Sequence, residues 1–174
     1  MTYTAKTFNL PALPGLSEKQ ITVHLALYEG YVKNVNLILE NPAAGRFNFE
    51  FNGMRMHELY FEQLEGRLTS LTAGSALVGI EEKAREVATT RGVGWVVVYF
   101  DPDTKKPHTV FVNDHEVGQL AGLPIILALD MWEHAYMVDY LPAEKKNYVD
   151  AFFANVNWGV VEKRFEDAMK MSVA

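Results

Sequence analysis

The chain has 174 residues, 49% of them hydrophobic, so it is expected to bury a substantial core as one compact unit with at most two small subdomains. Its net charge of −6 argues against a nucleic-acid partner, and the absence of cysteine excludes disulfides, thiolate metal ligands and cysteine nucleophiles. No apolar signal segment and no apolar run of the roughly 18–20 residues that span a membrane is found, which favours a cytoplasmic protein without a membrane partner.

Residues 1–72 are predicted to form an irregular arm followed by an antiparallel helical hairpin. The arm covers residues 1–15, which carry several prolines and glycines. Ser17, with Gln20 three positions later, predicts a capping box at the start of a helix that reaches about Leu39.

A loop is predicted between the two helices of the hairpin. Asn41-Pro42 ends the first helix, and residues 42–52 carry an aromatic alternation that is not helical. Asn52-Gly53 is a turn signal. Residues 54–68 then show the helical period and form the second helix.

Residues 73–174 are predicted to form an α/β domain with a small three-stranded antiparallel sheet. A small-residue linker at 69–76 leads into a charged amphipathic helix at 77–91. The β-branched and aromatic segments that indicate strands are 94–100, 109–112 and 123–129. The remaining helices are expected at 131–140, 142–155 and 158–171. The fold class is therefore α+β.

Asp130 and His134 stand four residues apart, so on a helix they would face one point. His24 and His57 each lie in an apolar segment predicted to be helical. Three imidazoles and one carboxylate suit a single redox-active transition metal. Any one histidine alone is better explained as a hydrogen-bonded core residue. The Asp130/His134 pair alone is explained equally well as a capping or ion-pair arrangement. The combination favours a metal, because Asp130 ends an apolar strand and a buried carboxylate is costly unless it is paired or metal-bound.

Five motifs, in the same order along the chain, resemble those of the iron/manganese superoxide dismutases. They are residues 10–14, 24–36, 52–61, 92–95, and 130–136 followed by 155–158. The resemblance extends over nearly the whole chain.

The resemblance implies an enzyme that disproportionates superoxide to O₂ and H₂O₂. It implies one iron or manganese ion per chain, with His24, His57, Asp130 and His134 as ligands and a solvent molecule as the fifth. It also implies a homodimer, or a tetramer built from it. Two alternatives remain open, namely another mononuclear non-haem iron enzyme and a metal-binding homologue of low activity. The choice between iron and manganese is open as well.

Further residues receive their roles from the same resemblance. Tyr31 would be the gateway tyrosine beside the substrate channel, and Trp95 and Trp132 would form an aromatic wall. Glu133 would reach across the dimer interface to the last histidine ligand of the partner subunit, with Tyr136 beside it. Such a contact fixes the orientation of a ligating imidazole.

One departure concerns the residue that hydrogen-bonds the solvent ligand. Gly53 stands where some members of the family carry a glutamine. His115 falls nearest to the other position used for this purpose, so we assign it this catalytic role. Asn113 and Asp114 are the alternatives.

A second departure concerns charged and polar surface positions. Leu27 and Met137 together replace a polar pair that usually joins two subunits, which predicts a drier dimer interface and an altered proton path. The usual basic residue near the channel has no clear counterpart. Because the net charge would repel superoxide, a local basic rim is expected, for which Lys33, Lys145 and Lys146 are candidates.

Overall fold

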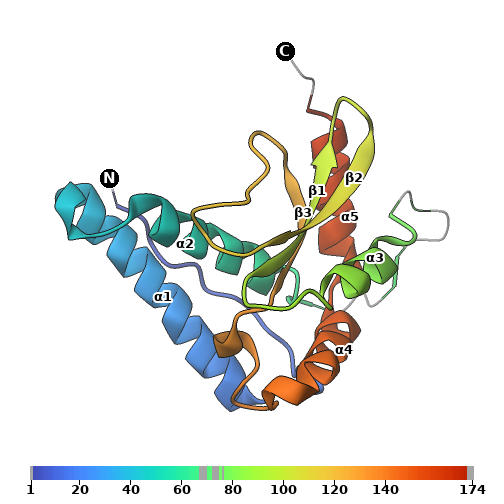
Figure 1. Cartoon of the computed structure of the whole chain (residues 1–174), viewed down its shortest axis with the longest axis horizontal. Helices are drawn as coiled ribbons and strands as arrows, with labels where there is room; N and C mark the ends of the chain where they lie inside the picture. The colour runs from blue at the N-terminus through green and yellow to red at the C-terminus, as the bar shows by residue number, and fades with distance from the viewer. Residues whose placement is uncertain (1, 67–69, 72–74, 76, 172–174) are drawn as a thin grey trace.

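The structure is a computed structural model that describes residues 2–66, 70, 71, 75 and 77–171. An N-terminal helical hairpin lies beside a three-stranded antiparallel sheet that packs with the remaining helices (Figure 1). The predicted α+β class is therefore confirmed. No helix in the described part of the chain is both long and apolar enough to cross a membrane.

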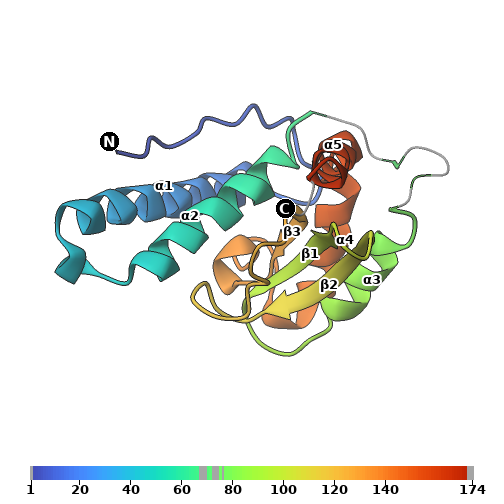
Figure 2. The same cartoon turned by 90° about the horizontal axis from the view of Figure 1, so that it is seen from above.

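The hairpin consists of α1 (Glu18–Glu40) and α2 (Phe47–Glu62), which lie side by side and are joined at one end (Figure 2). Ser17 caps α1, since its hydroxyl accepts a hydrogen bond from the Gln20 amide at 3.0 Å. The second half of the predicted capping box is wrong. The Gln20 side chain turns away from the cap and donates to the carbonyl of His134 at 2.7 Å.

The predicted loop over residues 42–52 is also wrong, because α2 begins at Phe47 after a short 3₁₀ turn. Phe47 and Phe51 are one helical turn apart and stack with centroids 5.4 Å apart. Gly53 lies inside α2 and makes no turn. A Cβ there would come within 2.7 Å of the Tyr31 ring, so the glycine permits close packing of the two helices.

Several predicted boundaries move in the structure. The second helix ends at Glu62 before the predicted end, and residues 67–69 and most of the predicted linker lie outside the described residues. The predicted helix at 131–140 is wrong: this segment contains a single 3₁₀ turn, Glu133–Ala135. The other elements are α3 (Ile80–Val87), β1 (Trp95–Asp101), β2 (Lys106–Val112), β3 (Ile125–Asp130), α4 (Lys145–Asn155) and α5 (Trp158–Met169).

The sheet has the strand order β2-β1-β3, with both pairings antiparallel. Strand β2 is at the edge of the sheet. Pro107 has no backbone N–H to donate, and such a residue is tolerated in an edge strand because one side of the strand has no neighbouring strand to bond. The register places Trp95 opposite Val112 on one side and opposite Asp130 on the other. The start of β1 and the end of β3 thus lie together.

Gln63, which follows α2, ties the hairpin to the sheet. Its fully buried carboxamide donates to the carbonyl of Ala128 on β3, and the Ala128 amide donates back to it at 3.2 Å. A buried amide group is stable only when its polar atoms are hydrogen-bonded. These two hydrogen bonds fix the position of α2 relative to the strand that ends in Asp130.

Gly94 and Gly30 form a matched pair of positions for testing where the backbone requires glycine. Gly94 has φ +140°, and a Cβ there would lie 2.2 Å from the carbonyl oxygen of Val112. We expect Gly94→Ala to lower the free energy of unfolding by about 3 kcal/mol or more. Gly30→Ala, in α1 with open space around it, should raise it by about 0.5–1 kcal/mol. Urea unfolding measures both free energies, and equal effects of the two substitutions would contradict the strain expected at Gly94.

Candidate metal centre

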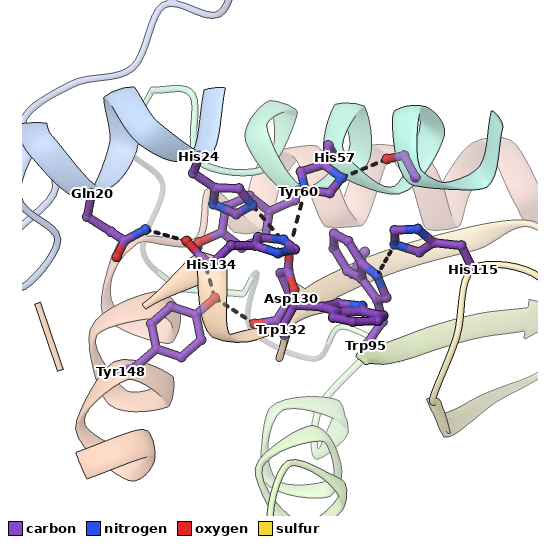
Figure 3. Close-up of polar contacts among 12 residues, drawn as sticks. Gln20, His24, His57, Tyr60, Trp95, His115, Asp130, Trp132, His134 and Tyr148 are labelled. Atoms are coloured by element: carbon purple, nitrogen blue, oxygen red, sulfur yellow. Dashed lines mark hydrogen bonds and ion pairs between the residues drawn. The ribbon is translucent and has the colours of Figure 1, made fainter. Parts of the chain in front are cut away.

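Four side chains from four separate segments converge at one point (Figure 3). They are His24 from α1, His57 from α2, Asp130 at the end of β3 and His134 in the 3₁₀ turn. Their facing nitrogen and oxygen atoms all lie within 4.8 Å of one another. His24, His57 and Asp130 are completely buried, and the side chain of His134 is 23% exposed.

One oxygen of Asp130 is the centre of the cluster. The Nε2 atoms of His24 and His134 each lie 3.1 Å from its Oδ2, and Nε2 of His57 lies 3.5 Å from it. The convergence of Asp130 and His134 is as the sequence predicts, but the reason differs. A strand end and a 3₁₀ turn bring them together, and no helix contains both.

The tautomer of His57 shows that this contact is not an ordinary hydrogen bond. Its Nδ1 lies 2.7 Å from the carbonyl of Gly53, and a carbonyl can only accept, so Nδ1 carries the hydrogen. Burial lowers the pKa of His57 well below its ordinary value, so the ring is neutral and Nε2 has a free lone pair. That lone pair faces a carboxylate oxygen. Two acceptors in this position repel each other unless a cation lies between them.

Asp130 is held as a carboxylate in a fixed orientation. Burial alone would raise its pKa, but the neighbouring imidazoles, above all His134, hold the pKa well below the usual range. Its Oδ1 accepts from the Trp132 amide at 2.8 Å, and its carbonyl accepts from the Tyr148 hydroxyl at 2.7 Å. The Oδ2 atom remains for the three histidines. This donor set, three imidazoles and one carboxylate, fits iron or manganese.

An aromatic group adjoins the cluster. The indole of Trp95 donates to Nε2 of His115 at 2.9 Å, so neutral His115 carries its hydrogen on Nδ1. That Nδ1 is buried and has no partner among the described residues. It borders the space that a Cβ on Gly53 would fill, and the His115 ring lies 5.3 Å from that of Tyr31. Burial lowers the pKa of His115 to about 4.

Of the three candidates for the outer hydrogen-bonding residue, only His115 is fully buried beside the cluster. Asn113 is exposed, and Asp114 accepts a hydrogen bond from the Glu116 amide at 2.9 Å. Trp132 also lies beside His115, and the centroids of the two rings are 5.7 Å apart.

The remaining predicted residues lie away from the cluster. Glu133 is exposed, whereas Tyr136 is buried and stacks on Tyr148 with centroids 5.2 Å apart. Both line a cavity of about 910 Å³ together with Lys145 and Lys146. The Lys145 ammonium donates to the Gly92 carbonyl, and Lys146 pairs with Asp150. Lys33 and Met137 are exposed, and Leu27 is half-buried.

Sequence reasoning missed several residues that shape the centre. Tyr148 holds the backbone of Asp130, Tyr60 lies 4.9 Å from the His24 ring, and Gln20 holds the segment of His134. Gln20 was visible only as a capping residue. For the two tyrosines the sequence contained no local signal, because their partners are distant along the chain.

Comparisons with known proteins agree with this donor set. A family model described as iron/manganese superoxide dismutases, C-terminal domain, matches residues 74–164. An iron superoxide dismutase of Aquifex pyrophilus is 32% identical over 192 residues, covering 91% of this chain and 88% of that protein. A manganese superoxide dismutase of Haloarcula marismortui is 32% identical over 180 residues, covering 90% and 88%. A manganese/iron superoxide dismutase of Aeropyrum pernix is 29% identical over 200 residues, covering 94% and 93%.

The depressed pKa of His115 predicts acid sensitivity of the metal-free protein. Since His115 has a pKa of about 4 in the fold and about 6.5 when unfolded, the unfolded state binds more protons between these values. Its contribution to stability is complete above about pH 6.5 and is lost as the pH falls toward 4. Asp130 does not contribute in this window, because its pKa lies below it in both states.

The free energy of unfolding falls as the pH is lowered from 6.5 to 4.5. We therefore expect His115→Gln to make this slope smaller by about 1 kcal/mol per pH unit. Urea unfolding of metal-free protein at several pH values measures the slope. The control is His108→Gln on β2, whose side chain is 45% exposed. Identical slopes for His115→Gln and the unmodified protein would contradict this account.

Proposed function

The chain belongs to the iron/manganese superoxide dismutase family, and on that premise we propose that it disproportionates superoxide at one iron or manganese ion. The ion would be held by His24, His57, Asp130 and His134. The observation that carries this proposal is the free Nε2 lone pair of His57 directed at the Asp130 carboxylate in a dry site. When bound, the ion supplies an acceptor for the electron of one superoxide and a donor of one electron to the next.

We assign His115 the task of directing a hydrogen bond toward the reacting oxygen species. Its Nδ1–H is the free donor of a ring whose other nitrogen is occupied by Trp95. The low pKa keeps the ring neutral at physiological pH, so the same tautomer persists there. Trp95 thus acts as a positioning residue.

Tyr31 is proposed as the gate to the centre. Its ring lies beside those of both His57, at 5.0 Å, and His115, at 5.3 Å. Burial raises the pKa of the Tyr31 hydroxyl, so it keeps its proton and can donate a hydrogen bond. Trp95 and Trp132 form the apolar wall that limits the entry of water.

A basic rim is proposed to attract the anionic substrate. Lys145 is a stronger candidate than Lys146, because it has no carboxylate partner among the described residues, whereas Lys146 is paired with Asp150. Lys33 is the exposed alternative on α1.

We further propose that two copies associate through the face that carries Glu133 and His134. Several large apolar side chains of α1 and of the segment after His134 are solvent-exposed in the single chain: Val23 (46%), Met137 (46%), Val138 (39%) and Leu141 (67%). In this arrangement Glu133 would reach the partner's His134, and Leu27 and Met137 would make the contact drier. The cytoplasmic location stays an expectation from the sequence.

The first test is metal content together with activity. We expect about one iron or manganese ion per chain and catalysed loss of superoxide in a cytochrome c competition assay. Asp130→Asn should abolish both, because it removes the only anionic ligand from a buried site. His108→Ala, at a histidine outside the cluster, should leave both intact. A metal-loaded protein without activity would point to a metal-binding homologue that is no dismutase.

The second test concerns assembly. Met137→Glu places a charge on the proposed interface and should raise the dimer dissociation constant by about 10-fold or more. Leu39→Glu is the control, since Leu39 is equally exposed (48%) but lies at the far end of α1. Sedimentation equilibrium measures both constants. A monomeric unmodified protein, or equal effects of the two substitutions, would refute the proposed interface.

A further inference from the structure

Gln20 is a fully buried polar residue in the first turn of α1, one helical turn before His24. Its carboxamide leaves the helix and contacts the segment that follows β3. Nε2 donates to the carbonyl of His134 at 2.7 Å, and Oε1 accepts from the amide of Val138 at 3.0 Å. Figure 3 shows the first of these bonds alongside the histidine cluster. One side chain therefore satisfies two backbone groups of the segment that carries a candidate metal ligand.

His134 is the candidate ligand with the weakest support from its own backbone. His24 and His57 lie within long helices, and Asp130 ends a strand paired with β1. The segment around His134 has only a three-residue 3₁₀ turn. His134 is also the only one of the four whose side chain is partly exposed. Its position therefore depends more on contacts from outside the segment.

The start of α1 supplies those contacts. The Ser17 hydroxyl caps the helix and leaves the Gln20 side chain free for the two bonds described above. The Ser17 amide adds a third bond to the same segment, donating to Asp139 Oδ2 at 2.7 Å. Three hydrogen bonds thus join the beginning of α1 to residues 134–139.

We propose that Gln20 is a positioning residue for the metal centre, which holds the backbone between His134 and Val138 so that the His134 imidazole faces Asp130. The inference depends on the proposed function only in that His134 binds the ion. The carboxamide matches the task, because it offers one donor and one acceptor at a fixed spacing. Outer partners that orient a ligating histidine typically change metal affinity by about 10–100-fold when they are removed.

The test compares Gln20→Met with Asn36→Leu in metal-loaded protein. Asn36 makes a similar two-bond clamp from the same helix, since its side chain binds both the amide and the carbonyl of Tyr3 at 2.8 Å. Tyr3 lies in the N-terminal arm, away from the centre. Both substitutions replace an amide by an apolar side chain of similar size. The measurement is the rate at which the bound ion is lost to EDTA, well below the unfolding temperature of either variant.

We expect Gln20→Met to lose the ion about 10-fold faster than the unmodified protein, and Asn36→Leu to stay within about 2-fold of it. The visible absorption of the bound manganese(III) ion should shift in Gln20→Met and stay unchanged in Asn36→Leu. Equal rates and equal spectra for the two variants would overturn the proposal. An unmodified protein that holds no ion at all would instead contradict the proposed function.

A measurement on the unmodified protein decides the matter if Gln20→Met does not fold. The Val138 amide has Gln20 as its hydrogen-bond acceptor, so its hydrogen exchange reports whether the clamp is closed. We expect slow exchange of this amide in the metal-free protein and slower exchange after loading with manganese. Exchange at the rate of an unstructured amide, with or without manganese, would overturn the proposal.

Discussion

The structure is organised around the buried carboxylate of Asp130. A carboxylate with no exposed surface is stable only when its charge is balanced and its oxygens are occupied. Here three imidazoles surround one oxygen, and the lone pair of His57 adds to the negative potential. The contact between His57 and Asp130 is favourable around a divalent or trivalent cation and repulsive without one.

The two halves of the chain are joined so that this carboxylate meets the histidines. The hairpin supplies two of the imidazoles, and the sheet supplies Asp130 and, just beyond it, His134. Gln63 connects the end of α2 to β3, and Gln20 connects the start of α1 to the segment after β3. Both glutamines are buried side chains that bond to backbone groups of the other half. The metal centre and the contact between the two halves are therefore parts of one structure.

The residue types at positions 53 and 115 are linked by the space that their side chains share. The ring nitrogen of His115 and the ring of Tyr31 border the space in which a side chain at position 53 would lie. A larger residue at position 53 and a histidine at position 115 could not both fit without displacement. Two residues separated by 62 positions therefore share one volume, and the presence of one limits the choice at the other.

The fold class, the family and the identity of the four converging residues could all be predicted from the amino-acid sequence, because the motifs are local and retain their order. The same holds for most helices and strands, whose hydrophobic period arises from neighbouring residues. The start of α2 and the turn around His134 were decided by tertiary packing, which overrides the local signals of Asn52-Gly53 and of residues 131–140. The tautomers of His57 and His115, and the clamp made by Gln20, also appeared only in three dimensions. Each depends on a hydrogen bond between groups whose separation in space cannot be read from local sequence patterns.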